Sequence, residues 1–308
     1  MATQAKQIDQ PWEWRESGRA ARTWQATRRF IRRQPLGFAG LVVIALMLIG
    51  AIFAPQLRTS DPGGFGEDIL AKPGWDHWFG TNRDGQDMWS RVLYGARPAL
   101  QIGVGAVLVS LLIATVLALL AGFVGGVVDM LISRLMDILI CLPAILWALV
   151  LVTSAGDIPG LDQRGVKTLI VAISIGLVPI ITRILRGNVL QEKERPYIEA
   201  ARVLGANEWR IMFRHILPNL APLLIIVGSA TLPAAILAEA GLSVIGLGLE
   251  PGSPSWGGDL GGKARGLFAT YWWLPIFPGI ALSLAVLAFN LLGDSLRDTL
   301  DPRLRGVR

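Results

Sequence analysis

Cysteine and histidine are almost missing from this chain, whose 308 residues include one cysteine, Cys141, and two histidines. A lone cysteine can form neither an internal disulfide nor a thiolate metal cluster. In the topology inferred below, His77 and His215 fall on opposite sides of a membrane, so they cannot share a metal ion. Cys141 lies in the apolar run ILICLPAIL, where we expect it to serve as a small buried hydrophobic side chain.

The motifs of hydrolases and nucleotide-binding proteins are missing as well. Neither HExxH nor GxSxG occurs in the sequence. Gly257, Gly262 and Lys263 have the spacing of a phosphate-binding loop, but Ala264 stands where a magnesium-binding Ser or Thr is required. A membrane-embedded enzyme is therefore disfavoured, and we expect no catalytic site, cofactor or metal in this chain.

Charge is scarce at 17% of residues, whereas 52% are hydrophobic and the mean hydropathy is +0.50. A helix needs about 20 apolar residues to cross roughly 30 Å of hydrocarbon. The fourth uncharged run is short, and we expect Lys167 and Arg183 to extend from it toward the two interfaces. The sequence predicts an all-α integral membrane protein with six transmembrane helices, from the uncharged runs 35–57, 98–128, 138–156, 168–182, 215–238 and 266–293.

Acidic residues are absent from the middle of every predicted span. Asp137 and Glu239 lie at span ends, where an interfacial position is expected. This distribution argues against an ion-coupled secondary transporter, which is the main alternative class.

The basic residues predict the orientation, because retained loops carry the excess of Lys and Arg. With the N-terminus inside, the inner segments hold 20 of the 29 basic residues and the outer segments hold nine. Both termini are therefore predicted to be cytoplasmic. The first apolar stretch is long and lacks a small-residue cleavage site, so we interpret it as a retained anchor. The net charge of +6 follows largely from this bias and does not indicate nucleic-acid binding.

One charged stretch, PYIEAARVLGANEWRIMFRHILPN at 196–219, interrupts the apolar runs on the predicted cytoplasmic side. Pro196 suits the first position of a helix, and Glu199 complements the dipole of its first turn. Gly205 can end that helix near Leu204 in a left-handed conformation, and Asn207 can cap a second helix. The stretch thus predicts a helix, a turn and a helix, with Pro218 turning the chain into the fifth span.

Small side chains on the first helix suggest how it is used. Ala200, Ala201 and Gly205 would allow close approach by the backbone of a partner. The alternative is an amphipathic helix that rests on lipid headgroups. Residue spacing within the stretch favours the first interpretation.

EAA at 199–201, Gly205 three residues later, and Leu217 with Pro218 resemble the EAA loop of permease subunits of binding-protein-dependent ABC importers. His215 stands where the general pattern has an isoleucine. Three further stretches are similar to the second permease subunit of the dipeptide, oligopeptide and nickel systems: FGTNRDGQDMWSRVLYGARPAL, ILAEAGLSVIGLGLEPGSPSWGGDL and GDSLRDTLDPRLR. Asn82, Gln86 and Pro98 depart from that pattern, and no chemical role is assigned to 79–90.

The resemblance implies a type I ABC importer permease in a bacterial or archaeal inner membrane. Its implied partners are a second homologous permease subunit, two ATPase subunits that bind ATP and magnesium, and an extracytoplasmic solute-binding protein. It implies a cytoplasmic segment over 1–36, a first span with an external segment over 37–96, and a five-helix core over 97–294. The EAA coupling loop occupies 196–218 within this core, and a cytoplasmic tail covers 295–308.

The resemblance assigns coupling to the ATPase to one set of residues: Glu199, Ala200, Ala201, Leu204, Gly205, Asn207, Leu217 and Pro218. ATP-driven closure would move this loop and rotate the attached spans, giving alternating access. Di- or oligopeptides are the expected solutes, with nickel chelates, opines or short sugars as alternatives. The residues that line the pathway are not identified by the sequence.

Overall fold

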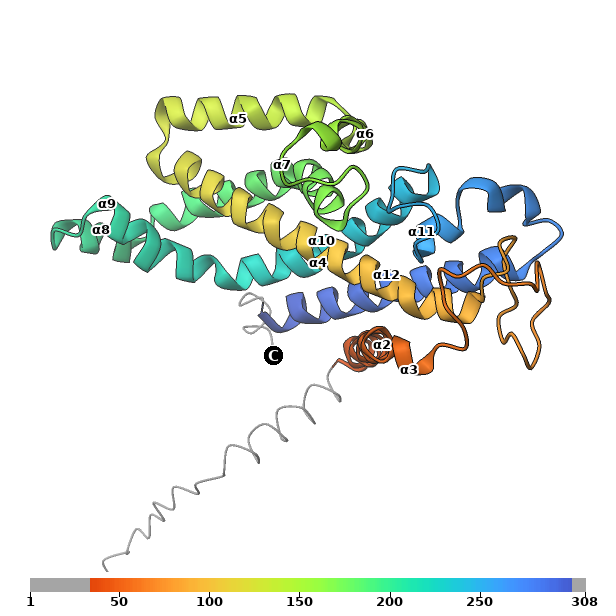
Figure 1. The fold of residues 1–308 in the computed structure, drawn as a ribbon. Helices are drawn as coiled ribbons and strands as arrows, with labels where there is room; N and C mark the ends of the chain where they lie inside the picture. Colours follow the sequence, from red (N-terminus) through yellow and green to blue (C-terminus); the bar gives the residue numbers. More distant parts are fainter. Residues whose placement is uncertain (1–33, 301–308) are drawn as a thin grey trace, which may run out of the picture.

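The computed structural model describes residues 34–300, and no β-strand occurs in that range. Five helices are long and apolar enough to cross a membrane, and a bent helix pair is a candidate sixth span. Figure 1 shows α8 and α9 at one end of the molecule, called the α8 end below. Residues 1–33 of the predicted cytoplasmic segment and 301–308 of the predicted tail lie outside the described range.

The long helices agree with most of the predicted runs but extend beyond them. They are α2 (Pro35–Ile52), α4 (Met88–Leu119), α7 (Val166–Lys193), α10 (Leu217–Val244) and α12 (Trp273–Leu300). Short helices are α3 (Ala54–Leu57), α8 (Pro196–Val203), α9 (Glu208–Ile211) and α11 (Trp256–Asp259). The fourth predicted run, 168–182, is too short by itself, and flanking residues on both sides extend it into a 28-residue helix, α7, which is long enough to span the hydrocarbon.

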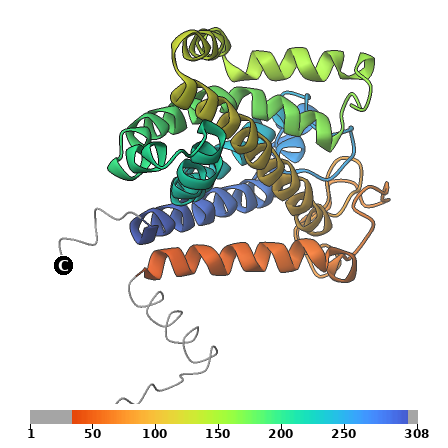
Figure 2. The same cartoon turned by 90° about the vertical axis from the view of Figure 1, so that its left-hand side faces the viewer.

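The third predicted run, 138–156, is divided between two helices. α5 (Gly126–Cys141) and α6 (Ala144–Ser154) meet at an angle of 87°, and Figure 2 shows them from the α8 end. Pro143 has no N–H and restrains Leu142 to an extended conformation, so one straight helix cannot form. The Nε1–H of Trp147 donates to the carbonyl of Leu139 at 3.0 Å and satisfies one of the acceptors that the break leaves free.

Two ion pairs fasten α5 to α7. Arg186 binds Asp129 through two nitrogen atoms, and Arg183 donates to Asp137. The sequence predicts that Arg183 extends toward an interface, and the structure adds an ion-pair partner for it, Asp137. Paired charges of this kind are tolerated near a membrane where isolated ones are not.

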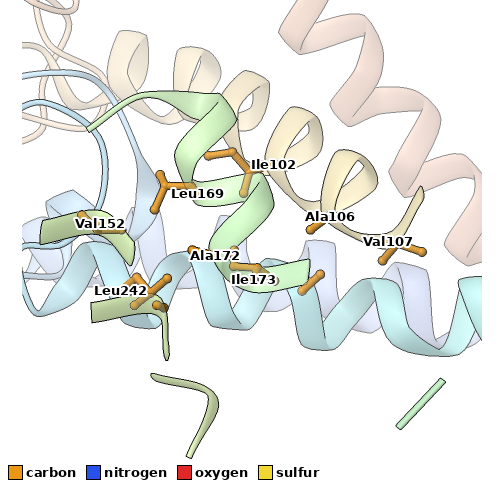
Figure 3. Close-up of a cluster of buried hydrophobic side chains, with 10 residues drawn as sticks. Ile102, Ala106, Val107, Val152, Leu169, Ala172, Ile173 and Leu242 are labelled. Atoms are coloured by element: carbon orange, nitrogen blue, oxygen red, sulfur yellow. The ribbon is translucent and has the colours of Figure 1, made fainter. Parts of the chain in front are cut away.

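Small and β-branched residues pack the centre of the bundle, where α4 crosses α7 and α10 (Figure 3). A Cβ on Gly105 would lie 2.6 Å from Ile170 of α7, and one on Gly103 would lie 2.8 Å from Ile236 of α10. Close backbone approach of this type supplies dispersion contacts, which hold membrane helices together where the hydrophobic effect does not. The central cluster comprises Ile102, Ala106, Val107, Ala148, Val152, Leu169, Ala172, Ile173, Ala235 and Leu242.

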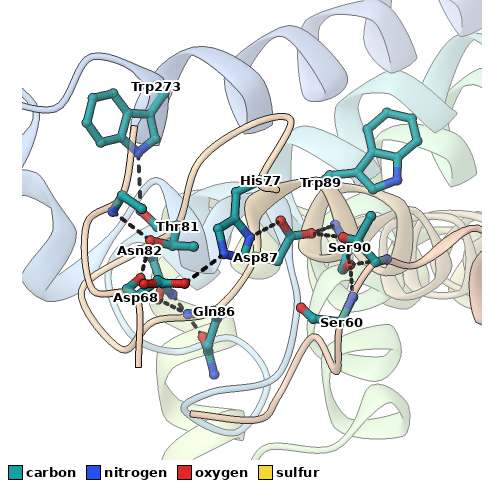
Figure 4. Close-up of polar contacts among 12 residues, drawn as sticks. Ser60, Asp68, His77, Thr81, Asn82, Gln86, Asp87, Trp89, Ser90 and Trp273 are labelled. Atoms are coloured by element: carbon teal, nitrogen blue, oxygen red, sulfur yellow. Dashed lines mark hydrogen bonds and ion pairs between the residues drawn. The ribbon is translucent and has the colours of Figure 1, made fainter. Parts of the chain in front are cut away.

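The segment 58–87 folds over the end of α4 that is opposite to α8. Asp87 caps α4 and is fully buried, and its carboxylate accepts from the N–H of Ser90, the hydroxyl of Thr59 and the ring of His77 (Figure 4). The indole of Trp273 donates to the carbonyl of Thr81 at 3.1 Å. These bonds start α4 ten residues before the predicted run begins.

Glu239, which the sequence places at a span end, lies near the end of α10 and is enclosed by protein. Its side chain is 1% exposed and accepts from the hydroxyl of Ser243 at 2.8 Å. α10 continues past it to Val244, and the following loop packs on it so closely that a Cβ on Gly257 would lie 2.5 Å from the carbonyl of Ala240. The loop therefore covers this turn of α10.

A buried ion pair joins that loop to α4. The guanidinium of Arg91 binds Asp259 at 2.7 Å, and both side chains are about 95% buried. Arg91 also donates to Gln86 and to the carbonyls of Pro62, Gly252 and Ser253, so three segments meet at one cation. Burial raises the pKa of Asp259, and the charge of Arg91 opposes that effect.

Replacing Arg91 by alanine is predicted to destabilise the protein by about 3 to 5 kcal/mol, because Asp259 would be left buried without its counter-charge. The change should appear as a lower thermal unfolding midpoint in detergent. Arg58→Ala is the control, since Arg58 forms an exposed pair with Asp61 at 3.8 Å and should contribute less than about 1 kcal/mol. Equal midpoints for the two variants would show that the buried pair does not hold the loop.

Candidate coupling site

The helix α8 begins and ends as its sequence predicts. Pro196 occupies its first turn with Glu199, and Arg202 lies in its last turn. At its end, Gly205 takes a φ of +82°, its N–H donates to the carbonyl of Arg202, and the N–H of Ala206 donates to the carbonyl of Ala201. This pair of bonds is a Schellman motif, which requires a residue that tolerates positive φ at position 205.

A second cap starts α9 immediately afterwards. The side-chain oxygen of Asn207 accepts from the N–H of Arg210 at 2.8 Å, as predicted for an N-cap. Across the turn, Arg202 and Glu208 form an ion pair at 3.6 Å. α8, the turn and α9 together form what we call the α8–α9 hairpin, residues 196–211.

One side of the hairpin is packed on the ends of the long helices. Ile198 is fully buried, and Ala201 and Ala206 pack beside it. Their partners come from the ends of α4, α7 and α10 and from α9 itself: Leu119, Phe123, Val189, Ile211, Met212, Ile216 and Leu220. Because these contacts reach three spans, the hairpin cannot shift without moving them or breaking the cluster.

Polar contacts reinforce this packing at the ends of α7 and α10. The hydroxyl of Tyr197 donates to Glu192 of α7 at 2.7 Å and accepts from Asn219 of α10 at 2.8 Å. Burial is the main cause that raises the pKa of Tyr197, and the bond to Glu192 adds to it. Lys193 donates to the carbonyl of Phe123 at 2.7 Å, where the helix from α4 ends.

The opposite side of the hairpin is exposed and apolar. Val203 and Leu204 are 83% and 87% exposed, and Ala200 lies on the same surface. A Cβ on Gly205 would meet nothing within 4 Å in this chain. We call Ala200, Val203, Leu204 and Gly205 the apolar tip. Large hydrophobic side chains this exposed outside a membrane span mark a surface that binds a partner.

The predicted coupling residues therefore divide between the two sides. Glu199 is exposed and forms no ion pair within residues 34–300, whereas Ala201 and Leu217 pack inward. Asn207 caps α9, so its role in this chain is to shape the turn. Val203 is not among the predicted coupling residues, although its spacing of three residues from Ala200 places both on one helix face.

The prediction that Pro218 turns the chain was wrong. Residues from Glu208 to Val244 form one continuous 37-residue helix, and Pro218 lies in the first turn of its α10 part. A π-helical turn over Met212–Ile216 precedes the proline and adjusts the backbone where its missing N–H would otherwise break the bonding pattern. The hairpin is thus a direct extension of the α10 span.

Within the described residues, no group of three or more His, Cys, Asp or Glu side chains could hold a metal ion. The features of the site are a hairpin with both helices capped, an exposed apolar tip and a continuous connection to α10. Such an arrangement can bind another protein and transmit its movement.

Comparison with known proteins identifies the family of proteins in which this hairpin occurs. Residues 77–306 match the family model described as "Binding-protein-dependent transport system inner membrane component". Residues 22–73 match the model for the N-terminal transmembrane domain of oligopeptide transport permease C. Both models together cover nearly the whole chain.

Curated relatives match over most of their length. A glutathione transport system permease protein of Pectobacterium atrosepticum is 41% identical over 280 residues, which are 90% of each chain. A dipeptide transport system permease protein of Alkalihalophilus pseudofirmus is 38% identical over 93% of this chain and 92% of its own. A probable D,D-dipeptide transport system permease protein of Escherichia coli is 36% identical over 90% of each chain. The chain therefore belongs to the family of binding-protein-dependent transport system inner membrane components and is a multi-pass membrane permease of the ABC type.

Proposed function

We propose that this chain is one of two permease subunits of an ATP-driven peptide importer, and that its α8–α9 hairpin receives the movement of an ATPase subunit. The observation that carries the proposal is the exposed apolar tip on a hairpin whose other side is packed on three spans. Relatives named for glutathione, dipeptide and D,D-dipeptide transport support short peptides as the solute class. We expect two ATPase subunits, a second permease subunit and an extracytoplasmic binding protein as partners.

The tip offers more binding energy through shape than through charge. Burying an aliphatic side chain as large as Val203 or Leu204 contributes about 1.5 to 3 kcal/mol. An exposed ion pair from Glu199 would contribute at most about 1 kcal/mol. A shallow apolar groove on the ATPase is therefore the complementary surface we expect.

Movement can pass from the tip to the spans without a hinge. Displacing the tip displaces Ile198, which is packed between the ends of α7 and α10. The continuous helix from Glu208 to Val244 then carries the displacement along the full length of the span. Rigid-body rotation of packed helices is an established way to open and close a site. We propose that ATP and magnesium act only on the ATPase subunits.

The orientation follows from this role, since the ATPases and ATP are cytoplasmic. We predict that the α8 end faces the cytoplasm and that the segment 58–87 faces outward. In a Cys141→Ser background, Ser60→Cys should react with an impermeant thiol reagent added outside cells, and Ala200→Cys should react only after the membrane is opened. Reaction of Ala200→Cys in intact cells would contradict the orientation.

Leu204→Asp should uncouple transport from ATP hydrolysis. A carboxylate at this exposed position leaves the fold of this chain intact but would be desolvated in an apolar groove, which costs several kcal/mol. Peptide uptake by the reconstituted transporter is predicted to fall at least tenfold, and stimulation of ATP hydrolysis by the loaded binding protein should be lost.

Glu199→Ala is the matched control on the same helix, because it removes an exposed charge without an ion pair in the described chain. We expect it to retain more than about a fifth of the parent uptake rate, in line with an effect below about 1 kcal/mol. All variants are compared at equal abundance in the membrane. Parent-like uptake by Leu204→Asp would show that the apolar tip is not the coupling surface.

A further inference from the structure

A pocket of about 410 Å³ opens at the end of the bundle opposite to α8. Its walls come from the starts of α4 and α12, the end of α10, the loop 246–261 and the residues just before α7. Three long helices, α4, α10 and α12, thus contribute side chains to one cavity, which lies at the predicted outer end of the bundle. A volume of this size is in the range of small-molecule sites.

Four charged side chains line the rim of this pocket, and they are balanced in sign. Arg83 and Arg164 are basic, whereas Asp84 and Glu250 are acidic. None of the four forms an ion pair in the described part of the chain, although other charged residues nearby do so. They come from three separate segments, so folding rather than local sequence brings them together.

The pocket wall also contains a buried acceptor. Asp259 lines the pocket, is 8% exposed and uses its Oδ1 atom to bind Arg91. Its Oδ2 atom is buried and has no hydrogen-bond partner among residues 34–300. Arg91 does not donate to Oδ2, since its other N–H groups donate to Gln86 and to three backbone carbonyls. The buried pair of Arg91 and Asp259 therefore forms the wall of the pocket, and Arg83, Asp84, Arg164 and Glu250 are the charges that remain for a ligand.

We propose that this pocket is a binding site for a zwitterionic short peptide on its way from the binding protein to the spans. The α-ammonium group binds between Glu250 and Asp84. The α-carboxylate binds Arg83 and Arg164. The identity of the ligand rests on the proposed function as a peptide importer, but the pocket and its charges do not.

Balanced charges inside one small cavity favour a small ligand with both charges over a docked protein surface. Complementary protein patches usually place one sign opposite the other over a wide area. Here both signs line a single cavity, which suits the two ends of one short molecule. The alternative is that the binding protein docks into the pocket, and the experiment must distinguish this from binding of the peptide.

Protection of a pocket cysteine from chemical labelling tests the proposal. Ser253 lines the pocket, and we would place Ser253→Cys in a Cys141→Ser background. The complete transporter in nanodiscs, without binding protein, is treated with an impermeant thiol reagent while Ala-Ala is added. Labelling should slow twofold when the peptide concentration equals its dissociation constant. N-acetyl-Ala-Ala-amide, which has neither terminal charge, should give no protection over the same range.

Charge variants then assign the two ends of the peptide. Glu250→Gln and Arg164→Gln should each raise the half-protecting concentration about tenfold, as expected for loss of one charge-assisted bond. Glu67→Gln and Lys167→Gln are matched controls, since both are exposed charges outside the pocket and should change nothing.

Three results would overturn the proposal: equal protection by the free and blocked peptides, no protection by Ala-Ala at any concentration, or protection by the binding protein alone. Peptide uptake by the complete system is measured separately. A transporter that imports no peptide yet shows charge-dependent protection would refute the proposed function and leave the pocket assignment intact. A transporter that imports peptide without protection of Ser253→Cys would refute the pocket assignment and leave the proposed function intact.

Discussion

The packing of Ile198 against the ends of α4, α7 and α10 is the contact on which the proposed mechanism depends. It makes a short, exposed hairpin part of the membrane bundle rather than a loose loop. The Schellman motif at Gly205 and the Asn207 cap fix the shape of the hairpin, and the Tyr197 bonds fix its angle to the spans. The apolar tip is then presented to a partner at little conformational cost, because its backbone is already ordered.

The opposite end of the bundle is stabilised by a different kind of interaction. Packing by small residues dominates within the spans, whereas buried charge dominates at the far end, where Asp87 caps α4 and Arg91 gathers three segments. Between these ends, the bent pair of α5 and α6 is held to α7 partly by ion pairs. Both ends of α4 and α10 are thus anchored, which allows a displacement at the tip to reach the pocket as a movement of whole helices.

Much of this could be predicted from the sequence, because hydrophobic runs and caps act locally. Pro196, Gly205 and Asn207 have the predicted roles in the hairpin, and the helical membrane fold is confirmed. Contacts between distant residues could not be predicted in this way. The partner of Arg183 is 46 residues away, and the loop that covers Glu239 follows it in the chain but folds back. The pocket could not be predicted, since its charges come from separate segments. Pro218 does not turn the chain as predicted, because a π-helical turn before it lets the helix continue.

The central claim is that the hairpin and the α10 span move as one body. A spin-label distance between Ala200 and Ala221 in the complete transporter tests it directly, with the nucleotide-free and ATP-trapped states compared. Both positions are exposed, and they lie on the hairpin and on α10. We predict that the mean distance changes by less than about 2 Å, which is the scale of small shifts between packed helices. A change of about 5 Å or more, equal to one helical turn, would contradict rigid coupling.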